Sequence, residues 1–278
     1  MTEIGVMQGR LLPRIDGRIQ AFPWNDWPSE FPTARAVGFD TIEFIFEGPD
    51  IRRHPLLKAG GRDSINKAVG DSGVRVGSIC ADYFMDEPLF RGSVAERDDR
   101  REVLSDLIDA ASGIGAKFLE IPCVDRSSLQ SERERSDLVD AVAAVLPEAQ
   151  EKEVGILLET DLPPLEFRSL IDRWSHPLVG ANFDSGNSAS LGYEPVEEIA
   201  TLGDLIQNVH IKDRLRGGTT VPLGTGAANF DRVFESLGRI GYDGALILQT
   251  ARDDDDVGAA SRYLAMVRRW SDKYLRRK

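Results

Sequence analysis

Four apolar runs in the second half of the chain carry, at or near their ends, a side chain that can bind a cation. Glu159 and Asp184 end two of these runs, His210 lies near the end of the third and Gln249 ends the fourth. They supply two carboxylates, an imidazole and an amide oxygen, a ligand set that suits Mn²⁺, Mg²⁺, Co²⁺ or Zn²⁺. Carboxylates beside apolar strands are costly to bury unless they are paired or bind a cation. The four positions therefore predict a site for one divalent metal ion.

Three further carboxylates belong to earlier apolar runs. Glu43 and Glu120 lie within such runs, and Asp82 directly follows one. We expect them at the same rim as the predicted metal site, where each either contacts the substrate or forms an ion pair that steadies the rim. The residues alone leave these two roles open.

Eight short apolar runs are the elements that must position these side chains. Their Ile, Val, Leu and Phe content without strict alternation is typical of parallel strands buried on both faces. Amphipathic stretches such as 93–112 and 131–153 lie between them and predict helices. The expected strands are 4–7, 41–46, 76–81, 118–121, 155–158, 179–183, 206–211 and 245–249.

A β-strand followed by a helix, repeated eight times, predicts a closed (β/α)₈ TIM barrel. A doubly wound open sheet is less favoured, because no GxGxxG turn follows the first strand and more than six strands are expected. No linker rich in Pro, Gly or Ser divides the chain, so residues 1–278 are expected to form one domain. In such a barrel the chemistry takes place at the carboxyl ends of the strands.

The composition limits the classes of partner that the chain is expected to bind. The 34 basic and 46 acidic side chains give a net charge of −12, which disfavours nucleic acid as a partner. The two cysteines are too few for a disulfide scaffold, and no run of about 18 apolar residues predicts a membrane span. We expect a cytoplasmic protein that acts on a small molecule and contacts neither nucleic acid nor membrane. Homo-oligomer formation is left open.

Four segments resemble the metal-ligand segments of the xylose-isomerase-like sugar isomerases and epimerases. They are 156–159 (ILLE), 182–187 (NFDSGN), 209–213 (VHIKD) and 246–249 (LILQ), and the similarity extends over essentially the whole chain, including 7–11 (MQGRL). The second and third segments, together with 221–226 (VPLGTG), are most similar to the sugar-phosphate 3-epimerases and hexulose-phosphate isomerases.

The resemblance implies one divalent metal held by Glu159, Asp184, His210 and Gln249. It also implies a sugar or sugar phosphate as substrate and an isomerase or epimerase reaction through an enediolate. The sequence departs from the family at Gln249, where most of these epimerases have a glutamate that acts with the strand-five glutamate as a second acid/base group. Glutamine can ligate a metal, but it cannot carry a proton.

A base must remove the proton next to the substrate carbonyl, and Glu159 is the candidate. Epimerisation ordinarily needs a second acid/base group on the other face of the substrate. Either Glu159 works alone as a shuttle on one face, or a second group takes part. The candidates for that group are Glu43, Asp82, Glu120 and Lys212.

Cationic residues near the last strands could hold a phosphate group of the substrate. The loops after strands seven and eight of such barrels often bind phosphate, and here they contain Arg214, four glycines and Arg252. Arg10 after the first strand either binds phosphate or pairs with a rim carboxylate. Asn187 of the 182–187 segment is a further expected substrate contact. The glycines serve equally well in tight turns, so phosphate binding is left open.

Two other function classes remain open. A dehydratase acting on a keto-inositol or related polyol would eliminate water through the same enolate. A non-catalytic metal-binding or sugar-binding relative is the other, and the glutamine at 249 is the best argument for it. An abasic-site endonuclease is disfavoured, because its metal cluster needs more histidines than this rim provides.

Overall fold

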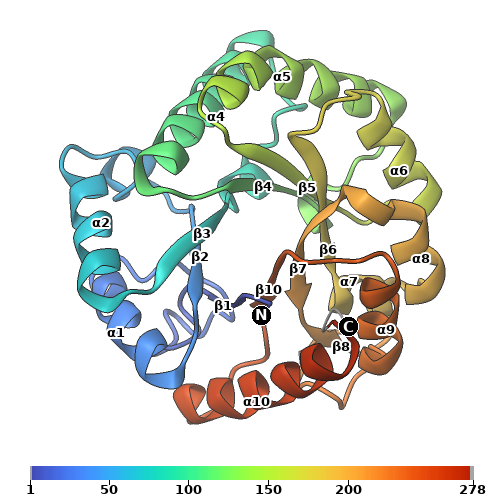
Figure 1. Ribbon diagram of the computed structural model, residues 1–278. Coiled ribbons are helices and arrows are strands. Elements are labelled where there is room, and N and C mark those ends of the chain that lie inside the picture. The colour runs from blue at the N-terminus through green and yellow to red at the C-terminus, as the bar shows by residue number, and fades with distance from the viewer. Residues whose placement is uncertain (1, 276–278) are drawn as a thin grey trace.

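In the computed structural model, which describes residues 2–275, eight parallel strands close into a barrel surrounded by helices (Figure 1). The closed order is β1-β10-β7-β6-β5-β4-β3-β2, so each strand pairs with its neighbours in sequence and the first pairs with the last. The strands are β1 (Ile4–Met7), β2 (Thr41–Ile45), β3 (Arg75–Cys80), β4 (Phe118–Cys123), β5 (Gly155–Thr160), β6 (Val179–Asp184), β7 (Ile206–Ile211) and β10 (Ala245–Leu248).

The fold-class prediction is confirmed, and all eight expected strands are present with ends shifted by at most two residues. Two short strands that were not predicted, β8 (Asp213–Arg214) and β9 (Thr220–Val221), form an antiparallel pair after β7. They are too short to give a hydrophobic pattern. The assignment of residues 1–278 to one domain stays a prediction.

The helices form the outer layer of the barrel. They are α1 (Trp27–Val37), α2 (Gly61–Ser72), α3 (Tyr83–Asp86), α4 (Val94–Ile114), α5 (Glu132–Glu151), α6 (Pro164–Asp172), α7 (Ser185–Leu191), α8 (Pro195–Leu202), α9 (Phe230–Arg239) and α10 (Asp256–Tyr274). Short 3₁₀ turns occur at Ile51–Arg53, Asp125–Ser127 and Gly203–Leu205. None of the helices in residues 2–275 is both long enough and apolar enough to cross a membrane.

Local sequence explains where several helices begin and end. Ser93 and Ser131 accept hydrogen bonds from the backbone three residues later, as N-cap residues do. Asp255, within the acidic run 253–256, caps α10 in the same way. Gly115 ends α4 in the left-handed conformation that glycine adopts at little cost. The predicted helical stretches 93–112 and 131–153 thus begin at the two N-cap serines.

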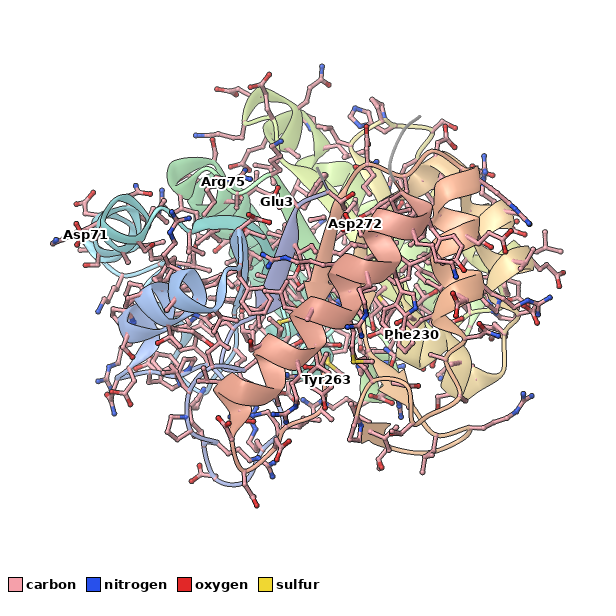
Figure 2. The ribbon with its side chains drawn as sticks, turned by 60° about the horizontal axis from the view of Figure 1, so that its bottom comes forward. Glu3, Asp71, Arg75, Phe230, Tyr263 and Asp272 are labelled. Carbon is pink, nitrogen blue, oxygen red and sulfur yellow. The ribbon has the colours of Figure 1, made fainter. Side chains whose placement is uncertain are left out.

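The barrel is held closed by strands and helices that bury their apolar side chains together. The fully buried side chains include Phe31 and Phe44, and Trp270 of α10 stacks on Phe230 of α9 with ring centroids 4.7 Å apart. Figure 2 shows Phe230 beside α10, which packs along this side of the molecule. The packed core therefore fixes the positions of the strand ends relative to one another.

Candidate active site

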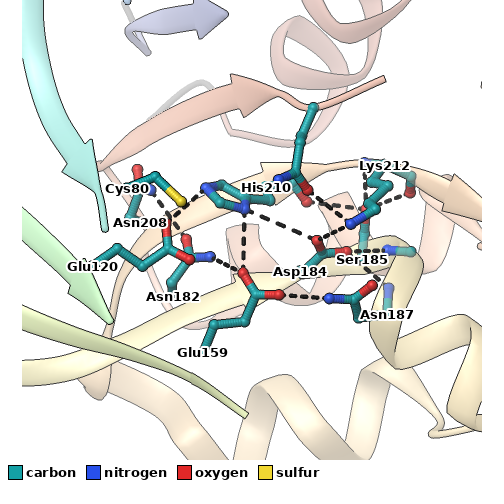
Figure 3. A network of polar contacts seen from close by, with 12 residues as sticks. Cys80, Glu120, Glu159, Asn182, Asp184, Ser185, Asn187, Asn208, His210 and Lys212 are labelled. Carbon is teal, nitrogen blue, oxygen red and sulfur yellow. Dashed lines mark hydrogen bonds and ion pairs between the residues drawn. The ribbon is translucent and has the colours of Figure 1, made fainter. Parts of the chain in front are cut away.

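The imidazole of His210 lies among four carboxylates inside the barrel. Figure 3 shows Glu120, Glu159 and Asp184 around the ring. Its Nε2 atom is 2.5 Å from Glu43 Oε1 and 3.2 Å from Glu120 Oε2. Its Nδ1 atom is 3.3 Å from Glu159 Oε2 and 3.9 Å from Asp184 Oδ2. We call these five residues the His210 cluster. The structure thus brings together four of the carboxylates and the histidine that the sequence singled out.

Strand pairing explains why these side chains meet. Side chains alternate between the two sides of a strand, and in a barrel every second one points inward. Asp184 of β6 pairs in register with His210 of β7. His210 and Glu43 are completely buried, and Glu120 is 1% exposed. The barrel interior therefore holds an unusual concentration of charge.

Asp184 has two functions in the fold. As the N-cap residue of α7, it accepts hydrogen bonds from the backbone N–H groups of Gly186 and Asn187 through Oδ1, both at 2.8 Å. Its other oxygen, Oδ2, is 3.2 Å from the Lys212 ammonium. A side chain at Gly186 would collide with Lys212, since an added Cβ would lie 2.7 Å from Lys212 Cγ. The glycine therefore lets α7 start directly beside β7.

Glu159 is oriented by two amide side chains. Asn187 Nδ2 donates to Oε1 at 2.5 Å and Asn182 Nδ2 donates to Oε2 at 2.8 Å. Burial disfavours the charged carboxylate, but His210, 3.3 Å away, and the charge of Lys212 outweigh it and lower the pKa of Glu159 to about 2. Glu159 is therefore an oriented carboxylate that is charged at neutral pH.

Three polar residues support the His210 cluster and were given no role from the sequence. Ser78 and Asn208 donate to Glu43 Oε2, at 2.5 and 2.9 Å, and Asn208 also donates to Asn182. Asn182 and Asn208 each lie two residues before a member of the cluster, so they point to the same side of their strands. That alternation is the signal that would have found them.

His210 Nδ1 is buried and has no hydrogen-bond partner among the described residues. Nε2 is directed at Glu43, which leaves Nδ1 facing the oxygens of Glu159 and Asp184. Burial disfavours the charged imidazole, but Glu120 and Glu43 outweigh it and raise the pKa of His210 well above its usual value. This position thus favours a positive charge, carried either by a proton or by a metal ion.

Two groups of three side chains have the spacing that a metal site requires. One is Glu159, Asp184 and His210, and the other is Glu43, Glu120 and His210, each with ligand atoms within 4.8 Å of one another. The first group contains three of the four predicted ligands and lies nearer the mouth of the barrel, since Asp184 ends β6 and Glu159 is the last but one residue of β5. These buried residues could hold a divalent cation.

Gln249, the fourth predicted ligand, hydrogen-bonds to neighbours outside the His210 cluster. Its Oε1 atom accepts from Lys212 Nζ at 2.8 Å, and its Nε2 atom donates to Gln20 Oε1 at 3.0 Å. Gln20 Nε2 in turn donates to Asp82 at 2.6 Å. The Lys212 ammonium therefore lies between Asp184 and Gln249. Gln20 lies in a loop without a repeating pattern, so no sequence signal pointed to it.

Arg10 and Arg252 lie in a network that holds the loop after β1. Arg10 donates to the backbone oxygens of Thr250 and Ile19 and to Gln20. Arg252 donates to the backbone oxygens of Gly9 and Leu12 and pairs with Asp256. The Arg252 side chain is 5% exposed. The structure therefore places these two predicted substrate contacts in internal hydrogen bonds.

Arg214 connects the loop after β7 to the base candidate. Its guanidinium donates to Gly218 O at 3.0 Å and to Asn187 Oδ1 at 2.8 Å. Asn187 donates in turn to Glu159. Arg214 therefore orients Asn187, and through it Glu159, from the side of the loop.

A cavity of about 420 Å³ lies at the opposite end of the barrel. Its lining includes Glu3, Arg75 and Lys117, which flank the amino ends of their strands. Glu3 and Arg75 form an ion pair of 2.8 Å there, and Figure 2 shows both residues at this end. Because the His210 cluster continues to the carboxyl ends, where barrels of this class carry their chemistry, we place the candidate site at that end.

Comparison with known proteins agrees with this geometry. L-ribulose-5-phosphate 3-epimerase UlaE of Salmonella paratyphi A is 27% identical over 252 residues, which is 88% of each chain. The solved structure of an L-ribulose 3-epimerase superposes with a TM-score of 0.77 at 17% identity, covering 98% of this chain and 95% of the other. The IOLI protein, solved with a binding zinc atom, gives 0.75 at 16% identity, with 97% and 98% covered.

The family model described as xylose isomerase-like TIM barrel matches residues 31–270. This range contains the whole His210 cluster and every barrel strand except β1. The resemblance found in the four sequence segments is thereby confirmed. The chain belongs to the xylose isomerase-like TIM barrel family.

Proposed function

We propose that the chain is a divalent-metal-dependent sugar isomerase or epimerase that removes a proton next to the substrate carbonyl. The observation that carries the proposal is the group of Glu159, Asp184 and His210, in which the Nδ1 atom has no hydrogen bond among the described residues and faces two carboxylates. Support comes from the relative named L-ribulose-5-phosphate 3-epimerase. A small sugar is thus the proposed partner.

Glu159, Asp184 and His210 would hold the cation. Gln249 would serve as the fourth ligand if the Lys212 ammonium moved away from its oxygen. A divalent cation bound there supplies polarisation of the substrate carbonyl and stabilises negative charge on its oxygen. Mn²⁺, Mg²⁺, Co²⁺ and Zn²⁺ all accept this donor set, and the zinc atom bound by the IOLI protein supports a metal of this group.

Glu159 is the proposed base. Its two oxygens are held by Asn182 and Asn187, so the carboxylate has one orientation when substrate arrives. It is the last but one residue of β5, near the mouth of the barrel, and is charged at neutral pH. An oriented and charged carboxylate is what a proton abstraction requires.

Burial narrows the choice of a second acid/base group. Glu43 and Glu120 lie against His210 Nε2 inside the barrel, so we propose that they position the imidazole and do not reach substrate. Lys212 is 15% exposed in its side chain, and Asp82 follows β3 at the mouth. Lys212 and Asp82 are therefore the proposed candidates on the substrate side.

Gln249 favours a reaction that needs only one base. Its amide cannot take up or release a proton, and it is hydrogen-bonded to Lys212 and Gln20. Aldose–ketose isomerisation on one face, or dehydration of a keto-inositol through the same enolate, fits that constraint. If the test below finds metal binding but no proton exchange, the chain is a non-catalytic binding protein.

The test measures metal content and exchange of the substrate C–H proton with deuterated solvent. The protein loaded with Mn²⁺ should exchange protons of a ketose, whatever the final product. Glu159→Gln keeps an oxygen ligand and loses the proton acceptor, so exchange should fall by a factor on the order of 10² or more with most of the metal retained. Glu166→Gln, on the exposed face of α6, is the matched control. Exchange near the wild-type rate in metal-loaded Glu159→Gln would refute Glu159 as the base.

A further inference from the structure

We infer that the site takes an unphosphorylated sugar, although the relative described above carries a sugar phosphate in its name. The inference rests on the proposed function, because it names the substrate class of the same site. Three features of the described residues carry it: the backbone amides of the loop after β7, the arginines around the mouth, and the charge of the rim.

The loop after β7 already holds an anion that belongs to the chain. The Asp213 carboxylate is fully buried and accepts hydrogen bonds from the backbone N–H groups of Gly224, Gly226 and Ala228, at 2.9, 2.9 and 3.0 Å. A Cβ atom at Gly226 would lie 2.2 Å from Asp213 Oδ1, so glycine permits this close approach. A cradle of backbone amides is what binds phosphate in many proteins. Here Asp213 occupies it.

The arginines near the mouth are engaged in internal hydrogen bonds. Arg10 donates to the backbone oxygens of Thr250 and Ile19, and Arg252 donates to that of Gly9 and pairs with Asp256. Arg214 donates to Asn187 and Gly218. Recruiting any of them to a phosphate group would leave buried or half-buried acceptors without their donors, which is costly.

Carboxylates dominate the rim. Glu47 follows β2 and pairs with Arg18, Asp82 follows β3 and Asp161 follows β5. Glu159 and Asp184 lie just inside. A dianionic phosphate ester near these groups would be repelled, whereas sugar hydroxyls can donate to carboxylates at no charge cost. The rim thus suits a neutral polyhydroxy ligand.

Arg216 is an exposed cation in the loop after β7, and a phosphate group would need such a cation to bind there. It lines a hollow of about 190 Å³ with Phe183, Tyr193 and Arg232. Phe183 precedes Asp184 on β6, so its side chain points to the opposite side of that strand, toward the helices. The hollow therefore opens on the helix side of β6 and away from the His210 cluster.

The experiment compares free sugars with their phosphate esters. Ketopentoses and ketohexoses and their terminal phosphate esters are supplied to the Mn²⁺-loaded chain, and kcat/KM for proton exchange is measured at low and high NaCl. We expect at least about tenfold higher kcat/KM for the best free sugar than for any ester. Salt should raise kcat/KM for the esters, because it screens repulsion, and leave that of the free sugar unchanged.

A variant sharpens the comparison. Asp161→Asn removes a rim charge that forms no ion pair among the described residues, so kcat/KM for esters should rise relative to that for the free sugar, while Glu166→Gln should not change the ratio. Calorimetric binding of free sugar, ester and inorganic phosphate to the Mn²⁺-loaded chain gives a second readout.

Higher kcat/KM or tighter binding for an ester, or a decrease of its kcat/KM with salt, would overturn the inference. Loss of that preference in Arg216→Ala would then locate the phosphate at the loop hollow. If neither class exchanges protons, the proposed function fails, and the calorimetry still reports which class binds.

Discussion

Glu43 orients the imidazole of His210 from its Nε2 side, away from the candidate metal site at Nδ1. It accepts from His210 Nε2 and from Ser78 and Asn208, and it is completely buried. A carboxylate in this position sets the histidine tautomer, which leaves Nδ1 free to bind a metal. Glu43 is thus a positioning residue that acts through His210.

Glu43→Gln should therefore weaken metal binding without removing a ligand. One Glu43 oxygen becomes an N–H₂ group, which must face either His210 Nε2 or the Asn208 and Ser78 donors. Either arrangement pairs two donors and weakens the hold on the His210 ring, so we expect roughly 10- to 100-fold lower affinity for Mn²⁺. Titration calorimetry measures it. Ser78→Ala, which removes one of three donors to Glu43, should have a smaller effect. Equal affinities in wild type and Glu43→Gln would remove Glu43 from the site.

The neutral amide of Gln249 offers both the acceptor and the donor that its neighbours require. Its oxygen faces Lys212 and its N–H₂ group faces Gln20 Oε1. In Gln249→Glu a carboxylate oxygen would face Gln20 Oε1, and a negative charge would be added near Asp184. We expect tighter metal binding by Coulomb attraction and slower exchange of the natural substrate, because the added charge opposes enediolate formation. A several-fold gain in proton exchange would mean that glutamine at position 249 lowers activity, and would favour the non-catalytic interpretation.

At the element scale, the loop between β1 and α1 is held by one buried carboxylate. Glu30 of α1 accepts from the backbone N–H groups of Gly9 and Leu11, at 2.8 and 3.0 Å. Burial raises the pKa of Glu30 from 4.5 to about 7, although these two hydrogen bonds and Arg10 oppose it. The loop carries Gln20 and Arg10, so the position of the mouth depends on this contact.

The raised pKa of Glu30 predicts a pH-dependent stability. Between about pH 4.5 and 7 the folded chain keeps a proton on Glu30 that the unfolded chain releases, so this group lowers the free energy of unfolding as pH rises, by about 3 kcal/mol in total. Glu30→Gln removes that dependence and one backbone hydrogen bond. Urea unfolding at pH 4.5 and 7.5 should show the variant gaining on wild type at the higher pH. A difference between the two proteins that does not change with pH would contradict the pKa of Glu30.

At the scale of the whole molecule, the barrel core sets the spacing of the strand ends. Leu119 of β4 is fully buried beside Glu120, and its truncation to alanine leaves a cavity in the layer that supports the His210 cluster. Leu119→Ala should cost about 2–5 kcal/mol of stability, whereas Leu165→Ala on the exposed face of α6 should change it by about 0.5 kcal/mol or less. Denaturant unfolding measures both. Similar losses in the two variants would show that the barrel core does not limit stability.

The sequence by itself determined the barrel and the candidate ligands. Apolar runs ended by polar residues are a local pattern, and the closure of eight parallel strands follows from their number and order. Helix caps such as Ser93 and Ser131 were equally readable, because a cap depends on residues three positions apart. Glu159, Asp184 and His210 were therefore identifiable from the chain alone.

Only the tertiary structure decided which partner each polar side chain has. Gln249 forms hydrogen bonds with Lys212 and Gln20. Glu43 and Glu120 contact the Nε2 side of His210. The arginines of the mouth hold the loop after β1. These contacts join residues as many as 243 positions apart. No periodicity links such residues, because hydrogen-bond partners across a barrel are chosen by strand register and loop packing. Those two properties exist only once the barrel has closed.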